Sequence, residues 1–173
     1  MTRIIPTVFL VFALPVSASS SDQPTLDSRI ECHSILHEYA SNTVTIISAD
    51  IVPADQRNPT YCKVFGTITI DIGFEVHLPT DWNGRFYMVG NEGSDGRINT
   101  RYLNSAARLN YATASTDLGY DINADGDAYG YKNRQKVIDY GFRATHLTAV
   151  VSKEIIETFY GVAAEYSYFV AGS

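Results

Sequence analysis

The chain has 173 residues, with 13 basic and 19 acidic side chains, a formal net charge of -6 and 45% hydrophobic residues. This length and composition suit one globular domain, or part of a larger one, with enough apolar side chains for a core. The acidic balance argues against a nucleic-acid partner, because phosphate contacts require clustered Lys and Arg side chains.

The first 18 residues are typical of a secretory signal peptide. Arg3 gives a positive start, residues 4–14 form an apolar run, and small residues before position 19 fit cleavage after Ala18. The run is too short to span a bilayer. We therefore expect a secreted, extracellular protein with no membrane contact after signal removal. An uncleaved anchor is the alternative.

Two cysteines, Cys32 and Cys62, remain in the expected mature chain. In a secreted protein an even number of cysteines suggests a disulfide, and two free buried thiols are the alternative. Cys32 lies near His33 and His37, but this cluster lacks the ligand spacing of a zinc site. We expect no metal there.

The first part of the mature chain is predicted to form a helix followed by antiparallel strands. The expected elements are a helix over residues 30–39 and strands over residues 44–52, 61–71 and 73–78. In the last of these strands, alternation predicts that Phe74, Val76 and Leu78 face inward and that Glu75 and His77 face outward. His77 is therefore expected at the surface rather than in the role of a catalytic base.

From residue 85 onward, strands and helices alternate, which favours a parallel sheet covered by helices. The expected elements are strands over residues 85–89, 111–116 and 166–171, helices over 100–110 and 137–160, and a polar loop over 117–131. The second helix carries one apolar stripe of Phe142, Leu147, Val151, Ile155 and Phe159, and Gly161 fits its C-terminus. The aromatic last strand is predicted to be buried.

A glycine-rich loop over residues 90–96 follows the strand at 85–89. Ligands of parallel sheets bind at the carboxyl ends of strands, and glycine lets backbone N–H groups approach a ligand. Gly90, Asn91, Glu92 and Gly93 are thus candidates for an oxyanion-binding loop, and an ordinary strand-to-helix turn is the alternative. The sequence argues against a phosphate loop, because no Gly-Lys-Ser/Thr follows and Glu92 and Asp95 would repel phosphate.

The last predicted strand leads into Ala171, Gly172 and Ser173, small residues followed by a serine. This is the first half of the nucleophile elbow of α/β-hydrolases, and a simple turn is the alternative. In that fold the catalytic acid and histidine follow the serine. His146 lies upstream at a half-buried helix position and is a weak candidate base, and Asp117 could contact the site or cap a loop.

Several stretches of the sequence, taken together, resemble the tannase and feruloyl esterase family. They are Tyr61-Cys-Lys-Val, Ile72-Gly-Phe-Glu-Val-His-Leu-Pro, Asp81-Trp-Asn-Gly-Arg-Phe, Ala114-Ser-Thr-Asp with Gly119, Ile138-Asp-Tyr-Gly-Phe-Arg-Ala-Thr-His-Leu-Thr, Tyr160-Gly, and Tyr168-Phe before the serine. The matching stretches run in order from about Cys32 to Ser173, nearly the whole expected mature chain.

The resemblance implies a secreted serine carboxylic ester hydrolase that cleaves galloyl or hydroxycinnamoyl esters, either as small molecules or linked to polysaccharide. It implies that Ser173 is the nucleophile, that the loop from Gly90 to Gly93 shapes the oxyanion hole, and that Cys32 pairs with Cys62. The family's calcium site lies in a lid that this chain does not include, so we expect no cofactor here.

The sequence also departs from the family pattern. Gly172 replaces a cysteine, Asn91 and Glu92 replace glycines, and Tyr120 stands where a histidine is common. The lid and the catalytic Asp and His would lie beyond the serine.

We therefore expect residues 19–173 to be the N-terminal part of an α/β-hydrolase domain, with a mostly parallel sheet and covering helices preceded by antiparallel strands. Such a truncated chain would be inactive alone. A non-catalytic secreted protein that binds phenolic or polysaccharide ligands is the alternative.

Overall fold

The computed structural model describes residues 26–39, 41–93, 95–128 and 130–172. The predicted signal peptide over residues 1–18 and the candidate nucleophile Ser173 lie outside these described residues.

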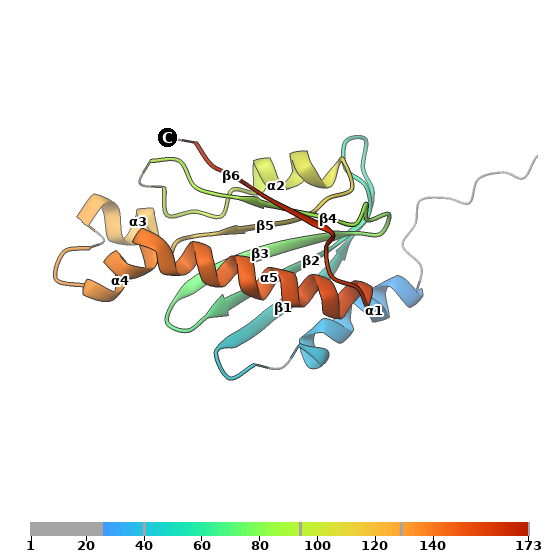
Figure 1. Ribbon diagram of the computed structural model, residues 1–173, viewed down its shortest axis with the longest axis horizontal. Helices are drawn as coiled ribbons and strands as arrows, with labels where there is room; N and C mark the ends of the chain where they lie inside the picture. Colours follow the sequence, from blue (N-terminus) through green and yellow to red (C-terminus); the bar gives the residue numbers. More distant parts are fainter. Residues whose placement is uncertain (1–25, 40, 94, 129, 173) are drawn as a thin grey trace, which may run out of the picture.

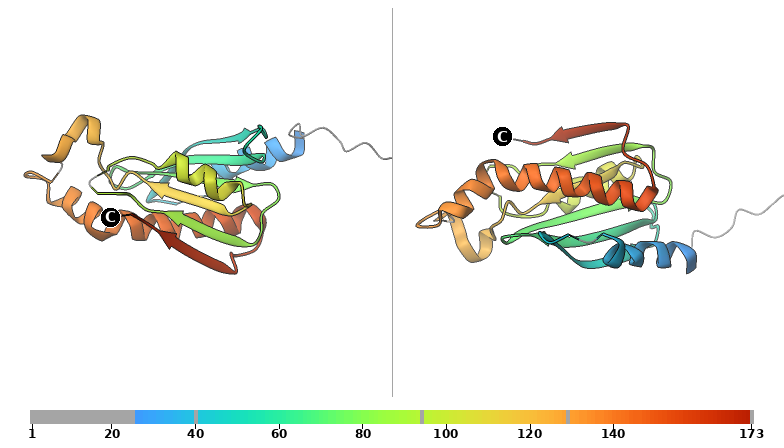
Figure 2. Two further views of the ribbon diagram at one scale, coloured as in Figure 1. Left: turned by 90° about the horizontal axis from the view of Figure 1, so that it is seen from above. Right: turned by 60° about the horizontal axis from the view of Figure 1, so that its bottom comes forward.

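The described residues form one six-stranded sheet with helices against its two faces (Figures 1 and 2). The helices are α1 (Leu26–Glu38), α2 (Thr100–Ala107), α3 (Ile122–Asp125), a 3₁₀ turn (Gly126–Ala128), α4 (Arg134–Ile138), a π-helical turn (Asp139–Arg143) and α5 (Ala144–Tyr160). The strands are β1 (Val44–Val52), β2 (Tyr61–Ile68), β3 (Ile72–Pro79), β4 (Arg85–Val89), β5 (Ala112–Thr116) and β6 (Tyr166–Val170).

The sheet is mixed, with strand order β1-β2-β3-β5-β4-β6. The pairs β1–β2, β2–β3 and β3–β5 are antiparallel, whereas β5–β4 and β4–β6 are parallel. The predicted change from antiparallel strands to a parallel βαβ arrangement is confirmed. As a result, the carboxyl ends of β4, β5 and β6 meet at the same edge of the sheet.

The core lies mainly between the sheet and the layer formed by α1 and α5 (Figure 2). Phe74, Val76 and Leu78 of β3 are fully buried there, as the alternation predicted. From α5, Ile155 and Ile156 are likewise fully buried. Removing large apolar side chains from water in this way is the main favourable contribution to folding.

The chain is helical throughout the predicted range 137–160, but a π-helical turn interrupts the regular α-helix, and the predicted apolar stripe is wrong in part. A π-helical turn separates α4 from α5, and such a turn inserts an extra residue and shifts the helical phase. Phe142, placed on the apolar stripe by a constant helical period, is instead 66% exposed. The buried face of α5 includes Thr148 and Ser152 in place of Leu147 and Phe159, which are only partly buried.

The expectation that His77 lies at the surface is also wrong. Its side chain is 0% exposed on β3, and its Nε2 atom lies 2.6 Å from Glu75 Oε1. The ring also stacks on Tyr61, with 4.4 Å between ring centroids. The alternation of β3 is typical of a strand with one face exposed to solvent. In the structure, however, α2 packs on the face that carries His77 and excludes water from it.

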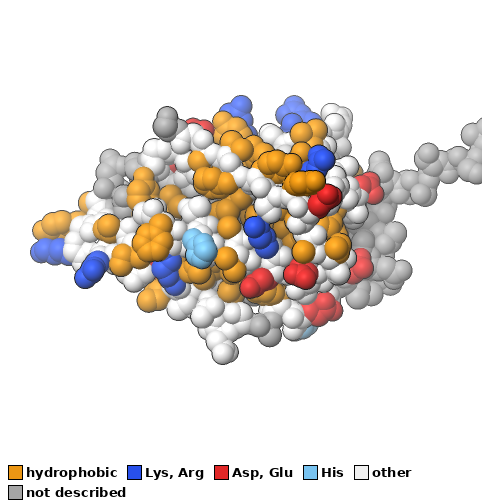
Figure 3. Space-filling view, in the orientation of Figure 1, with side chains coloured by type: hydrophobic (Ala, Val, Ile, Leu, Met, Phe, Trp, Pro, Cys, Tyr) orange, Lys and Arg blue, Asp and Glu red, His pale blue; other side chains and the backbone are white. Residues whose placement is uncertain are grey.

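The last strand, β6, lies at the edge of the sheet and pairs only with β4 among the described strands. All its residues are exposed, so the prediction of a buried strand is wrong for the described part of the chain. The reason is that α2 and α5 pack on β3, β4 and β5 rather than on β6. Figure 3 shows the resulting apolar surface, to which Tyr166, Tyr168, Phe169 and Val170 contribute.

The disulfide predicted between Cys32 and Cys62 is present, and it joins α1 to β2 in the core. Because Cys32 is oxidised, it is not available as a ligand for a metal beside His33 and His37. Gly161 ends α5 with a φ of +70°, the left-handed conformation expected at a helix C-terminus.

Candidate active site

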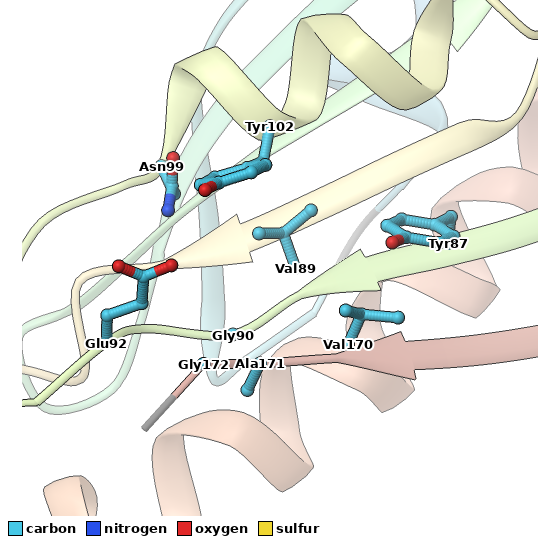
Figure 4. A pocket seen from close by; sticks show the side chains of 9 residues that line it. All are labelled: Tyr87, Val89, Gly90, Glu92, Asn99, Tyr102, Val170, Ala171 and Gly172. Atoms are coloured by element: carbon cyan, nitrogen blue, oxygen red, sulfur yellow. The ribbon is translucent and has the colours of Figure 1, made fainter.

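A hollow of about 240 Å³ lies beside the carboxyl ends of the parallel strands β4 and β6 (Figure 4). The strands and the loop after β4 contribute most of its wall, and the start of α2 contributes the rest. The lining residues are Tyr87, Val89, Gly90, Glu92, Asn99, Tyr102, Val170, Ala171 and Gly172. The structure thus brings the predicted glycine-rich loop next to the residues that precede Ser173.

Gly90 joins the two strands at the floor of this hollow. Its N–H donates to the carbonyl of Val170 over 2.8 Å, which extends the pairing of β4 with β6. A Cβ atom at Gly90 would lie 2.7 Å from Ala171 Cβ and 2.8 Å from Phe169 Cζ, so a side chain does not fit without displacement. Gly90 therefore lets β6 run close beside the start of the loop.

Asn91 fixes the shape of the loop through its side chain. The Nδ2 group donates to the carbonyl oxygens of Asp95, Arg97 and Thr116 over 2.7, 2.8 and 3.1 Å. The Asp95 carbonyl belongs to the loop, the Arg97 carbonyl follows it directly, and the third belongs to the last residue of β5. The side chain thus closes the loop on itself and ties it to the neighbouring strand.

The rest of the loop is held by two further contacts. The Tyr140 hydroxyl, from the π-helical turn, donates to the Gly93 carbonyl over 2.8 Å, and the Asp95 N–H donates to the Glu92 carbonyl over 3.2 Å. Within the described part of the chain, the backbone N–H groups of Asn91, Glu92 and Gly93 donate to no backbone carbonyl. An oxyanion hole requires backbone donors that are free in this way. Of the four predicted loop residues, Gly90 and Glu92 line the hollow, whereas Asn91 and Gly93 are not among its lining residues.

Asp117 lies just past the end of β5 and serves as a loop cap. Its Oδ1 atom accepts from the N–H of Gly73 over 2.9 Å and from the N–H of Gly119 over 2.8 Å. Burial raises the pKa of this carboxyl to about 6, although hydrogen bonds from Gly119 and Gly73 favour the charged form. Asp117 is not among the residues that line the hollow.

His146 is exposed on α5, whereas a half-buried position was predicted. It lines a separate groove between α5 and β6, together with residues such as Lys153 and Phe169. No histidine lines the hollow within the residues that the structure describes. The described residues alone therefore bring no histidine base into the hollow.

Sequence reasoning missed the aromatic wall of the hollow. Tyr102 comes from the first turn of α2, Tyr87 from the middle of β4, and Asn99 from the position before α2 (Figure 4). Asn99 precedes α2, but its side chain makes no capping hydrogen bond, so the N-cap preference of asparagine gives no signal for its place in the hollow. The tyrosines carried no signal either, since tyrosine is frequent throughout this sequence.

Neither a metal site nor a membrane-spanning helix is found in the described ranges. These ranges contain no group of three or more His, Cys, Asp or Glu side chains that could hold a metal ion. They therefore do not provide the calcium site implied by the resemblance. None of the helices in the same ranges is long and apolar enough to cross a bilayer.

The chain was compared with known proteins. The family model described as tannase and feruloyl esterase matches residues 57–173. An uncharacterized esterase of Xanthomonas campestris pv. campestris is 30% identical over 98% of this chain and 31% of its own length. Feruloyl esterase B of Aspergillus niger is 28% identical over 95% of this chain and 34% of its own length.

A solved structure supports the same relationship. The crystal structure of feruloyl esterase B from Aspergillus oryzae superposes with a TM-score of 0.74 and 26% sequence identity, over 83% of this chain and 32% of that one. The chain thus spans about a third of the length of the relatives it matches.

Proposed function

Because the chain belongs to the tannase and feruloyl esterase family, we propose that it supplies the nucleophile and the oxyanion loop of a secreted carboxylic ester hydrolase. The observation that carries this proposal is the hollow at the carboxyl ends of β4 and β6, which joins the glycine-rich loop to the residues just before Ser173. In this proposal residues 19–173 are the N-terminal part of an α/β-hydrolase catalytic domain.

The proposed reaction is acyl transfer through a serine ester. The Ser173 hydroxyl attacks the ester carbonyl, its oxygen bonds to the carbonyl carbon, and a base takes its proton. The backbone N–H groups of Asn91, Glu92 and Gly93 are the proposed donors to the resulting oxyanion. The carbon–oxygen bond to the alcohol then breaks and the base protonates the leaving oxygen. Water releases the acid by the reverse sequence of steps.

The base and its acidic partner are proposed to come from polypeptide that follows the serine, as in other α/β-hydrolases. This assignment is supported by the absence of a histidine from the lining of the hollow within the described residues. It is also consistent with the relatives, which are about three times as long as this chain. Removing the base typically lowers the rate by several orders of magnitude.

The proposed substrates are esters of phenolic acids. Tyr87, Val89 and Tyr102 give the hollow a largely apolar wall with two aromatic rings (Figure 4). Aromatic side chains favour flat aromatic ligands through stacked or edge-to-face contacts. Relatives named feruloyl esterase B point in the same direction.

The test begins with the protein as its natural source makes it, captured with an antibody against residues 61–90. Its intact mass is measured first. Hydrolysis of methyl ferulate and methyl gallate is then assayed, and a fluorophosphonate label separately reports whether the protein has a reactive serine. We expect a species far heavier than 19.1 kDa that hydrolyses at least one ester. In the same full polypeptide, Ser173→Ala should abolish turnover and labelling.

Ser167→Ala is the matched control, because Ser167 lies on β6 and does not line the hollow. It should retain activity and labelling. A species slightly below 19.1 kDa that binds phenolic ligands without hydrolysing them would reject the esterase assignment and favour a binding protein. Unchanged activity in Ser173→Ala would reject Ser173 as the nucleophile.

A further inference from the structure

Among the described residues that line the hollow, Glu92 is the only one with a formally charged side chain. Its side chain is exposed and takes part in no ion pair with another described residue. An exposed glutamate carries a negative charge at neutral pH. The hollow therefore combines an apolar, aromatic wall with one uncompensated carboxylate.

The position of this carboxylate is defined by its contact with Gly172. A Cβ atom at Gly172 would lie 2.7 Å from Glu92 Cγ and 3.0 Å from both Cδ and Oε1. The Glu92 side chain thus lies directly over the residue that precedes Ser173 in the sequence. Figure 4 shows its carboxylate turned toward Asn99 across the mouth of the hollow.

We propose that Glu92 determines specificity by charge, so that the hollow accepts neutral phenolic esters and disfavours ligands that carry a carboxylate near the scissile bond. This proposal rests on the proposed function, because it concerns the same hollow. Two negative charges a few ångströms apart at a partly exposed site repel one another enough to change affinity by about 3–10-fold. Salt screens such a repulsion.

The same charge has a second effect on a hydrolase. Cleavage converts a neutral ester into a phenolic acid, which is a carboxylate at neutral pH. Glu92 then repels the product but not the substrate, so it promotes release of the acid and limits product inhibition. The effect follows from the sign of the charge and does not require Glu92 to touch the reacting atoms.

The experiment compares the full polypeptide with its Glu92→Gln, Glu92→Asp and Glu165→Gln variants. Glu165 is a matched control, because it is an exposed carboxylate at the opposite end of β6 and does not line the hollow. For each protein, kcat/KM is measured for methyl ferulate and for a feruloyl ester whose alcohol carries a free carboxylate, at low salt and at about 0.5 M salt. The inhibition constant of ferulate is measured as well.

We expect Glu92→Gln to raise the ratio of anionic to neutral kcat/KM by about 3–10-fold at low salt, and to strengthen ferulate inhibition by a similar factor. The gain should shrink in high salt. Glu92→Asp should stay closer to the parent than Glu92→Gln does, and Glu165→Gln should leave both quantities unchanged. An unchanged ratio in Glu92→Gln, with active enzyme, would overturn the proposal while the proposed function stands.

A binding measurement separates the two proposals. Ferulate and its uncharged amide are titrated into the same proteins by calorimetry, which requires no turnover. If no protein hydrolyses an ester, the proposed function fails. The charge proposal then stands only if Glu92→Gln binds ferulate more tightly relative to the amide than the parent does. Equal ratios, or no binding of either ligand, would overturn it.

Discussion

Burial raises the pKa of the Asp117 carboxyl from its ordinary value of 3.8 to about 6. At pH values between 3.8 and about 6, the Asp117 carboxyl of the folded state retains a proton that the same group has released in the unfolded state. The contribution of this group to stability is therefore fully present below about pH 4 and falls as the pH rises toward 6.

We predict that Asp117→Asn removes this dependence, because an amide oxygen can still accept from Gly73 and Gly119 but does not titrate. Urea unfolding of the parent and the variant at several values between pH 4 and 7 measures the difference. The stability of the parent relative to the variant should fall from pH 4 to 6 and then stay level. A difference that is constant across this range would show that burial does not raise this pKa.

At the loop, Asn91→Ala should release three carbonyl groups from one amide donor. We expect a loss of about 1–3 kcal/mol, because partly buried carbonyls lose their hydrogen bonds. Hydrogen exchange should also become faster over residues 91–97. Asn42→Ala is the control, an exposed asparagine in the segment before β1. Equal exchange in both variants would mean that the side chain does not hold the loop.

At the scale of elements, two glycines that flank α5 form a matched pair. Gly141 lies in the π-helical turn before α5, and Gly161 ends the helix. Gly161 has a φ of +70°, whereas Gly141 lies in the π-helical turn without a positive φ, and both have open space where a Cβ would lie. Gly161→Ala should destabilise the protein by about 1 kcal/mol or more, since L-residues disfavour the left-handed conformation. Gly141→Ala should be neutral or stabilise it by about 0.5 kcal/mol. Thermal unfolding of both variants tests this, and an equal effect would contradict it.

Several elements could be predicted from local pattern alone. The strand over residues 44–52 has the predicted bounds, and the inward residues of β3 follow their alternation. The alternation of strands and helices predicted a parallel sheet, and it put the glycine-rich loop and Ser173 at the carboxyl ends of strands. The direct pairing of β4 with β6 was not predicted.

The failures arise where a second layer or an irregular helical turn decides the outcome. His77 is buried because α2 covers a face that its own strand marks as polar, and Phe142 is exposed because a π turn changes the helical phase. Tyr102 lines the hollow only because α2 packs against β4 and β5. No periodicity within a single segment reports such contacts, since they depend on residues far away in the sequence.

At the scale of the whole molecule, the bond between Cys32 and Cys62 attaches α1 to the sheet. Replacing both cysteines by alanine should cost roughly 3–4 kcal/mol, because a closed loop of about thirty residues restricts the unfolded chain. Guanidinium unfolding with and without a reducing agent measures this. The parent should lose stability on reduction, and the variant should not respond. If reduction leaves the parent unchanged, the bond does not contribute to stability.

The order of strands across the sheet also has a consequence for how the protein acquires its shape. β1, β2 and β3 pair with neighbours in sequence, so they can assemble as soon as Pro79 has left the ribosome. β4 is made next, but in the sheet β5 separates it from β3. It must therefore wait for β5 to be synthesised before it can join. The half of the sheet that forms the hollow is consequently the last to assemble on a nascent chain.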